Sequence, residues 1–334
     1  MSWRTPADAL RNELIELFLN HPTESLSGET ISEHFHISRT AIWKHLEHLE
    51  SLGFVFDAAP RRGYRLLSTP DILFEPLLQP HLSTHSLGRS VLYRPVIDST
   101  NRWAMELAEH GAPHGTVASA KEQSAGKGRR GRMWASPEGG LWMTLVLTKP
   151  IPLSRAGELT LLAGVAAAQS LRTLTGLDIR IKWPNDLLLN GRKLCGILAE
   201  IRAEAETVQT AVLGIGLNLT VAREDVPALL QETMISLSPS TSSPWTKARV
   251  AGAILSALEP LYDSLCQDAA GFSGVRSEWI ALCAHMQRTI TVRLGEQVVT
   301  GTCVDIDERG TLTIEVEGKR VQVPSGEIVR TEVW

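Results

Sequence analysis

Apolar residues return every three or four positions near the start of the chain, which is the spacing of one buried helix face. Leu10 and Leu14 share such a face in a first helix, and the same spacing predicts two more helices at 28–35 and 39–52. Two short apolar runs then flank a polar tip, which predicts a β-hairpin. Three helices followed by a hairpin predict a winged helix-turn-helix domain in residues 1–66.

After residue 90 the pattern changes, because short strand-like runs alternate with longer helical segments. This alternation predicts an α+β domain with a mixed or antiparallel sheet in residues 67–284. Residues 68–80 contain three prolines and are interpreted as a linker. Strands are expected at 91–96, 116–120, 141–147, 179–183, 193–202 and 208–215, and helices at 101–110, 154–175 and 244–266.

The last part of the chain is nearly all short β runs, such as ITVRL, LTIEV and VQV. Glycines lie between these runs and supply the turns. The runs are numerous enough for five strands. We therefore expect a small five-stranded β-barrel in residues 285–334.

The composition is that of an ordinary globular protein, with 334 residues, 43% hydrophobic and 21% charged. At roughly 150 residues per domain, this length suggests two or three domains. The net charge of −4 gives no global positive field, so any DNA binding must come from a local patch. The four cysteines have the spacing of neither a zinc site nor a disulfide framework. With no recognisable signal peptide and no bilayer-length apolar run, we expect a cytoplasmic location.

The most informative segment is KEQSAGKGRRGR at 121–132, where three glycines are interleaved with several cations. Such glycines let a backbone approach a ligand and direct N–H groups towards an anion. The segment matches GxGxxG literally, but no helix pattern follows, so it is not a dinucleotide fingerprint. A solvated basic loop is the alternative interpretation.

Three further segments lie at expected strand or helix ends. KWPND at 182–186 places a lysine beside a proline-fixed turn, although Pro-Asn-Asp is also ordinary turn chemistry. GIGLN at 214–218 suits close contact with a flat ring or ribose, although a β-bulge or turn is the better explanation of this segment taken alone. DSTN at 98–101 offers hydroxyls and an amide to a ligand, or simply caps a helix.

Together, GKGRRGR, KWPND followed by GRKLCGILAE, GIGLN and DSTN resemble the biotin–protein ligases. With the winged helix, the chain is similar to the bifunctional bacterial kind, which also represses biotin synthesis genes. The resemblance covers essentially the whole chain. It implies a central ligase domain like those of class II synthetases and an SH3-like C-terminal barrel. It also implies that biotin and ATP, with Mg²⁺, form biotinyl-5′-adenylate, which passes biotin to a lysine of the biotin carboxyl carrier protein of acetyl-CoA carboxylase.

The resemblance assigns roles to residues of this chain. The catalytic residues are expected to be Lys182 and Arg129. Biotin is expected to contact Ser99, Thr100, Asn101, Gln123, Lys127, Gly128, Arg129 and Lys182. The nucleotide is expected to contact Gly126, Arg132, Trp134, Asn185, Gly216, Leu217 and Asn218, with Asp186 as a weaker candidate for binding Mg²⁺ through water. The chain departs from the family in having Lys127 where arginine is common, and in the Ser/Thr-rich stretch 233–244, after which Trp245 is the candidate aromatic over adenine.

The DNA-binding surface is expected on the third helix and the hairpin tip. Residues 1–66 hold seven Lys or Arg and nine Asp or Glu, so their net charge of −2 is poor for non-specific DNA affinity. The outward side chains expected to contact operator DNA are Arg39, Thr40, Trp43, Lys44, Arg61, Arg62 and Arg65. A homodimer bearing adenylate would read two half-sites. Four histidines (34, 36, 45 and 48) suggest stronger binding at lower pH, and a protein-contact module is the alternative to DNA binding.

Two other functions remain open at this point. A ligand-sensing repressor that binds biotin without ligating it would use the same winged helix. A lipoate–protein ligase would share the central fold, although the GKGRRGR loop favours biotin.

Overall fold

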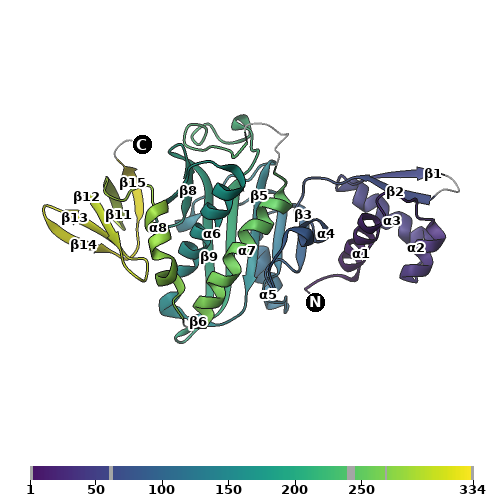
Figure 1. The fold of residues 1–334 in the computed structure, drawn as a ribbon, viewed down its shortest axis with the longest axis horizontal. Coiled ribbons are helices and arrows are strands. Elements are labelled where there is room, and N and C mark those ends of the chain that lie inside the picture. The colour runs from purple at the N-terminus through teal and green to yellow at the C-terminus, as the bar shows by residue number, and fades with distance from the viewer. Residues whose placement is uncertain (1–2, 60–62, 239–244, 268, 332–334) are drawn as a thin grey trace.

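The structure is a computed structural model that describes residues 3–59, 63–238, 245–267 and 269–331. The molecule is elongated, with a helical unit at the N-terminal end, a large sheet in the middle and a small β unit at the C-terminal end (Figure 1). Among the described residues, no helix is long and apolar enough to cross a membrane.

The N-terminal unit has the three helices and the hairpin that the spacing predicts. Its elements are α1 (Pro6–Asn20), α2 (Gly28–Phe35), α3 (Arg39–Ser51), β1 (Val55–Ala59) and β2 (Gly63–Ser68). The side chains of Thr5, Ser27 and Ser38 each accept a hydrogen bond from a backbone N–H in the first turn of the helix that follows. Leu14 and Leu49 are fully buried between these helices, so the apolar stripe forms the core of the unit.

The interpretation of residues 68–80 as a linker is wrong. This segment forms α4 (Glu75–Leu78) and the short 3₁₀ helix η1 (Gln79–His81), and Leu73 and Leu78 are buried. Glu75 forms an ion pair with Arg4 at 3.1 Å and accepts a hydrogen bond from the backbone N–H of Val91 at 2.9 Å. The prolines fit because two of them begin short helices, where no backbone N–H is needed.

The central sheet has the strand order β3-β4-β5-β10-β9-β8-β7, and β6 pairs with β10. β3 and β4 are parallel and the other neighbours are antiparallel, which confirms a mixed sheet. The strands are β3 (Val91–Ile97), β4 (Val117–Gln123), β5 (Gly140–Leu147), β6 (Ile151–Pro152), β7 (Ile179–Lys182), β8 (Asp186–Leu189), β9 (Arg192–Glu204) and β10 (Thr207–Asn218).

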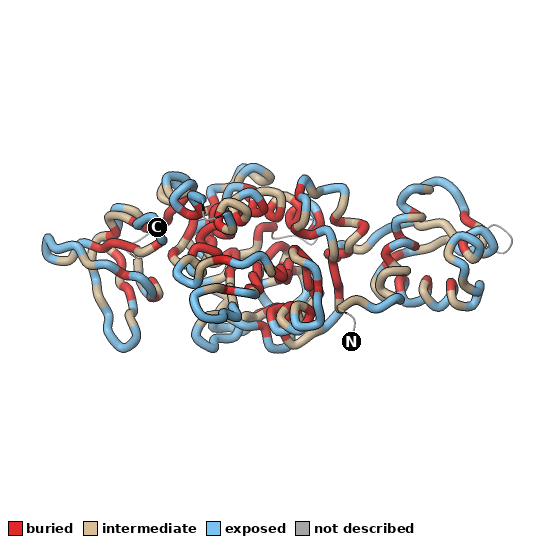
Figure 2. The backbone as a smooth tube through the Cα atoms, turned by 90° about the horizontal axis from the view of Figure 1, so that it is seen from below, coloured by how far each residue is buried: buried red, intermediate tan, exposed pale blue. Residues whose placement is uncertain are grey.

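The two faces of this sheet carry different helices. Leu213 of β10 packs in the cluster that includes Leu162 and Leu255, from α6 (Glu158–Thr175) and α7 (Lys247–Cys266). Its neighbour Val212 packs with Ala104 of α5 (Thr100–Glu109). Since successive side chains of a strand point to opposite faces, α6 and α7 cover one face and α5 covers part of the other. Figure 2 shows buried backbone concentrated in this central layer.

The C-terminal unit is an antiparallel five-stranded sheet of SH3-like form, with the order β14-β13-β12-β11-β15. Its strands are β11 (Thr289–Leu294), β12 (Gln297–Ile306), β13 (Leu312–Val316), β14 (Lys319–Val323) and β15 (Glu327–Thr331), preceded by α8 (Arg276–Leu282). The short helices η2 (Arg129–Gly131), η3 (Leu153–Arg155), η4 (Arg223–Asp225) and η5 (Gly271–Val275) complete the described elements. Trp183 joins this unit to the sheet, because its backbone N–H donates to Nε2 of His285 and its indole N–H donates to the carbonyl oxygen of Gly310.

Candidate active site

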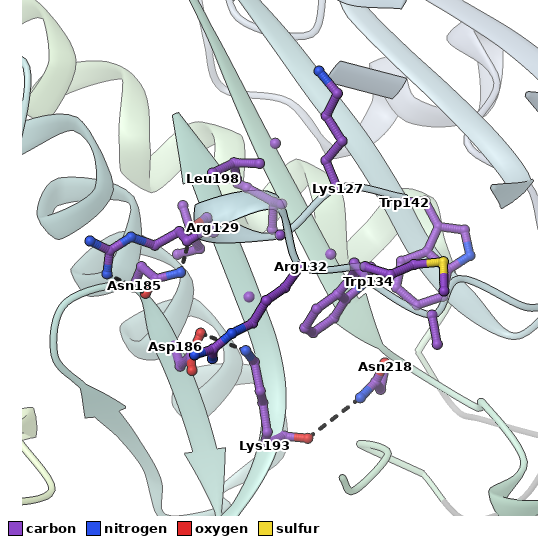
Figure 3. A pocket seen from close by; sticks show the side chains of 18 of the residues that line it. Lys127, Arg129, Arg132, Trp134, Trp142, Asn185, Asp186, Lys193, Leu198 and Asn218 are labelled. Atoms are coloured by element: carbon purple, nitrogen blue, oxygen red, sulfur yellow. Dashed lines mark hydrogen bonds and ion pairs between the residues drawn. The ribbon is translucent and has the colours of Figure 1, made fainter. Parts of the chain in front are cut away.

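A cavity of about 260 Å³ opens on the face of the sheet that carries α5 (Figure 3). Its walls come from the start of α5, the loop after β4, the β7–β8 turn, strands β9 and β10, and Glu327 of the C-terminal unit. The predicted residues that line it are Ser99, Thr100, Asn101, Gln123, Lys127, Gly128, Arg129, Arg132, Trp134, Lys182, Asn185, Asp186, Gly216 and Asn218. Segments that are far apart in the sequence therefore meet in one place.

One end of the cavity is lined by small polar side chains. Thr100 donates to Oε1 of Gln123 through its backbone N–H at 2.7 Å and through its hydroxyl at 2.9 Å. The amide of Gln123 then donates to Oγ of Ser136 at 2.8 Å. Ser99 is the N-cap of α5, but its side chain makes no capping bond and its buried Oγ has no hydrogen-bond partner among the described residues. Simple capping therefore does not explain Ser99, whereas a ligand's polar group would satisfy its hydroxyl.

The basic loop forms η2 and turns its arginines towards the C-terminal unit. Arg129 donates to Oδ1 of Asn185 and to the carbonyl oxygen of Gly326, both at 3.3 Å. Arg132 forms a two-pronged ion pair with Glu327. Burial, and then the neighbouring Arg130, lower the pKa of Arg129 below its usual value. The loop is therefore held across the cavity, and the interpretation as a merely solvated basic loop does not fit it.

The indole of Trp134 lies flat on two glycines of the sheet. A Cβ at Gly196 or at Gly216 would come within 2.8 Å or 2.7 Å of the Trp134 ring atoms. Nζ of Lys193 lies 4.9 Å from the ring centroid, and the Trp142 ring packs edge-on at 6.3 Å. The indole N–H is buried with no hydrogen-bond partner among the described residues. The glycines thus make room for the indole itself, and Trp134 gives the cavity an aromatic wall on which a flat ligand ring could pack.

The interpretation of GIGLN as a bulge or turn is wrong. β10 pairs with β5 and β9 in continuous register through this segment, and the strand ends at Asn218. Its glycines instead leave room for side chains that lie on the sheet, since a Cβ at Gly214 would come within 2.1 Å of Oδ1 of Asn101. The segment thus shapes two parts of the cavity.

Two lysines lie close to Asp186 in the cavity wall. Lys182 lies opposite Asp186 in the backbone register of the β7–β8 hairpin. Burial lowers the pKa of Lys182. Nζ of Lys193 lies 2.9 Å from Oδ1 of Asp186. The sequence interpretation missed Lys193 as a site residue, although it stands inside the quoted segment GRKLCGILAE. Strict alternation from Gly196 would put 193 on the opposite face of β9. An irregularity in the β8–β9 register turns Lys193 towards the cavity instead, so the sequence held no local signal for it.

Some predicted residues lie outside the cavity lining. Leu217 is fully buried in the core on the opposite face of β10. Gly126 packs under the loop, where a Cβ would come within 2.4 Å of the Trp134 carbonyl oxygen. Trp245 donates its indole N–H to the carbonyl oxygen of Leu174 and packs against the core, so it does not line the cavity. Of the 233–244 stretch, Thr233 and Met234 line the cavity, while 239–244 lie outside the described residues.

The predicted DNA-contacting side chains of α3 are exposed. Trp43 is 52% exposed, and Thr40 and Lys44 are also at the surface. Arg39 pairs with Glu29 at 3.1 Å and Arg65 with Asp57 at 3.5 Å, while Arg61 and Arg62 lie outside the described residues. The pKa values of His45 and His48 are lowered by burial and then by Arg11. Both shifts make these two histidines harder to protonate, and the stronger DNA binding at lower pH stays a prediction.

Three family profiles match the chain. They are the HTH domain over residues 10–65, the biotin/lipoate A/B protein ligase family over 93–218, and the biotin protein ligase C-terminal domain over 285–330. The fold is similar to that of biotin protein ligase from Aquifex aeolicus in complex with biotin and ATP. That likeness has a TM-score of 0.62 at 24% identity and covers 74% of this chain and 100% of that one. Fold and site together define a protein ligase of the biotin/lipoate class that carries a helix-turn-helix domain.

Full-length relatives narrow this class. The bifunctional ligase/repressor BirA of Bacillus spizizenii is 38% identical over 320 residues, which is 96% of this chain and 98% of the relative. The protein of the same name from Escherichia coli is 31% identical over 313 residues, or 92% of each chain. The chain belongs to this family of bifunctional biotin ligases and repressors, which confirms the resemblance seen in the sequence motifs.

Proposed function

We propose that the protein activates biotin with ATP as biotinyl-5′-adenylate and transfers it to a lysine of the biotin carboxyl carrier protein. The observation that carries this proposal is the composition of the cavity. The buried hydroxyl of Ser99, which has no hydrogen-bond partner among the described residues, the aromatic ring of Trp134 and several cations lie within one space of about 260 Å³. Such a set suits a ligand with a polar head, a phosphate and an aromatic base. The match along the whole length of BirA relatives supports the same function.

In the formation of biotinyl-5′-adenylate, different residues of the cavity would bind biotin, neutralise charge and bind the nucleotide. Ser99, Thr100 and Asn101 would bind the ureido head of biotin, because its donors and acceptors need partners once they are buried. The carboxylate of biotin must approach an anionic α-phosphate. Lys182 and Arg129, with Lys193 as an addition from the structure, would neutralise that repulsion and the charge that develops at phosphorus. Trp134, Gly216 and Asn218 would border the adenine and ribose.

Mg²⁺ would enter as the partner of the ATP phosphates. The described residues contain no group of three or more metal-ligating carboxylate, histidine or cysteine side chains. A single carboxylate, Asp186, fits a magnesium ion that keeps most of its waters and is bound largely by substrate phosphates. Asp186 already pairs with Lys193, so its proposed part is to hold a metal-bound water.

We further propose that the winged helix binds an operator of biotin synthesis genes and represses them in the cytoplasm. Domain limits at 1–66, 67–284 and 285–334 would separate DNA binding, ligation and the C-terminal unit. Adenylate would favour a homodimer, which brings two winged helices to one operator, and the carrier protein would compete for the same surface. The exposed Trp43 and Lys44 on α3 support a role in DNA contact.

The test of the ligase function is transfer of labelled biotin to a purified carrier domain with ATP and Mg²⁺. We expect the wild type to label the carrier and Lys182→Ala to lose at least tenfold in rate, because a half-buried cation near the reacting phosphate is removed. Lys319→Ala, at an exposed position of β14, is the matched control and should retain full activity. An inactive wild type beside an active control ligase would favour the sensor-only repressor, and labelling with lipoate instead of biotin would favour the lipoate ligase.

A further inference from the structure

Glu200 contacts two predicted biotin-binding residues without lining the cavity itself. It lies on β9, on the face of the sheet that carries the site. Its Oε2 accepts a hydrogen bond from Nδ2 of Asn101 at 2.8 Å, and its Oε1 lies 3.0 Å from Nζ of Lys127. Asn101 stands at the start of α5, whereas Lys127 belongs to the basic loop. One carboxylate therefore joins the polar end of the cavity to the loop that crosses it.

The Glu200 carboxylate makes the shorter of two contacts that set which way the Asn101 amide points, and the carbonyl oxygen of Leu198, which accepts from Nδ2 at 3.4 Å, makes the other. An ionised carboxylate only accepts hydrogen bonds, so it selects the NH₂ group of Asn101 and turns Oδ1 the other way. Oδ1 then accepts from the hydroxyl of Thr144 at 2.8 Å. Gly214 leaves space for this arrangement, since any side chain there would collide with Oδ1. A neutral amide in place of Glu200 would present both a donor and an acceptor, so only the longer contact with the carbonyl oxygen of Leu198 would still select this orientation.

The contact with Lys127 places the loop rather than stabilising the fold. The side chains of Lys127 and Glu200 are 39% and 34% exposed, and an ion pair at such a site adds about 1 kcal/mol or less to stability. In Figure 3 the Lys127 side chain extends away from Arg132 and Trp134. Lys127 is thus held on the side of the cavity where Asn101 lies, and the arginines of the loop contact the opposite side.

We propose that Glu200 is a positioning residue for biotin binding, because it fixes the amide of Asn101 and holds Lys127 beside it. This inference rests on the proposed ligase function. Glu200 would not contact the reacting atoms. Its effect would therefore fall on biotin affinity, while the rate at saturating biotin and the KM for ATP would change little.

The test compares full-length wild type with Glu200→Gln, measuring the Kd for biotin by calorimetry and the rate of carrier labelling. Losing a hydrogen bond to a charged group predicts a Kd and a KM for biotin about tenfold to a hundredfold higher, with kcat within about twofold. Glu204→Gln, four residues along the same strand and exposed, is the matched control and should behave as wild type. Glu200→Asp keeps the charge with a shorter reach and should recover part of the biotin affinity.

Three outcomes separate this inference from the function on which it rests. If the wild type does not label the carrier, the ligase function itself fails. If the wild type labels it and Glu200→Gln binds biotin with an unchanged Kd, only the positioning role is overturned. If Glu200→Gln does not fold, Glu200→Asp is compared with the wild type instead. In that variant, a loss of kcat as large as the loss of biotin affinity also overturns the positioning role.

Discussion

At the scale of single residues, the site depends on glycines as much as on charged groups. Gly214, Gly216 and Gly196 lie on two adjacent strands, and each is approached by a side chain that a Cβ would displace. These positions hold Asn101 and Trp134 flat against the sheet. The three glycines therefore set the depth of the cavity by letting these side chains lie close to the sheet. The charged residues do not determine this depth.

Gly214→Ala should weaken biotin binding by tenfold or more, because the new methyl group would stand 2.1 Å from Oδ1 of Asn101 and push the amide out of its network. Titration calorimetry with biotin measures the effect. The control is Gly164→Ala in α6, where a Cβ meets only Ile181 at 4.0 Å and alanine favours the helix. Unchanged affinity in Gly214→Ala would show that Asn101 does not bind biotin in the orientation described.

A second consequence at this scale concerns stability against pH. Burial and then Lys182 lower the pKa of His285 to about 3, while its Nε2 accepts the backbone N–H of Trp183 at 3.0 Å. Burial also lowers the pKa of His114 to about 4. The unfolded chain takes up these protons near pH 6.5 and the folded chain does not. The free energy of unfolding should therefore keep its full value above pH about 6.5 and decrease as the pH is lowered further.

The expected slope is about 1.4 kcal/mol per pH unit for His285 once the pH is well below 6.5. Urea unfolding at pH 7.5 and 5.5 gives the measurement. His285→Gln retains an acceptor for Trp183 but does not titrate, so its stability should depend less on pH than that of the wild type. Equal pH dependence in the two proteins would contradict the assignment to His285.

At the scale of elements, a buried carboxylate joins α7 to the start of the sheet. Glu259 is 5% exposed and accepts hydrogen bonds from the backbone N–H groups of His85, Ser86 and Leu87 at 2.6 to 2.8 Å. The hydroxyl of Ser86 adds a fourth hydrogen bond at 2.9 Å. These hydrogen bonds outweigh burial and lower the pKa of Glu259 to about 2. The residues that lead into β3 thus depend on one side chain of a helix.

Glu259→Gln should lower the free energy of unfolding by about 2 kcal/mol or more, since an amide has one acceptor oxygen and its NH₂ would face backbone donors. Urea unfolding at pH 7 measures this loss. Glu296→Gln, at an exposed position in the C-terminal unit, serves as the comparison and should be neutral. A loss below 0.5 kcal/mol in Glu259→Gln would mean that water replaces the missing bonds.

The same scale shows what the sequence could predict. The helices of the N-terminal unit and the five C-terminal strands follow from apolar spacing and turn residues, and the structure confirms them. β8 and α8 were not predicted, because β8 begins directly after the KWPN turn and α8 has only seven residues. The prolines in 68–80 were misinterpreted because burial of that segment depends on partners far along the chain.

The site residues show the same limit. Motifs identified the residues near the ends of strands and the basic loop, but they did not identify what each one contacts. Glu200 and Glu327 were missed because they act on Lys127 and Arg132 across 73 and 195 residues of sequence. Such partners are set by the register of strands and by the docking of the C-terminal unit. Neither is encoded in a local pattern.

At the scale of the whole molecule, the C-terminal unit contributes to the cavity. Glu327 lines it and pairs with Arg132, and the carbonyl of Gly326 accepts from Arg129. The hydrogen bonds from Arg132 lower the pKa of Glu327. The small β unit therefore fixes the basic loop.

Glu327→Gln should raise the KM for ATP several-fold, because the two-pronged pair with Arg132 is lost while the side chain keeps its size. The KM for biotin and the melting temperature should change little. Adenylate formation, followed by pyrophosphate release at varied ATP, measures the effect. Glu315→Gln on the exposed side of β13 is the control, and an equal change in that variant would remove the link to Arg132.

Among the described residues, those that line the cavity run from Ser99 to Glu327, and none belongs to the winged helix. The N-terminal and C-terminal units therefore differ in whether they can be replaced without changing the cavity. Another DNA-binding domain could replace the N-terminal unit without altering any wall of the ligand site. The same biotin site could then regulate a different operator. The C-terminal unit is not interchangeable in this way, because it would have to supply its own carboxylate for the loop. A hybrid regulator built on this chain should keep together the residues that follow β2 and exchange the N-terminal unit as a whole, with both strands of its hairpin.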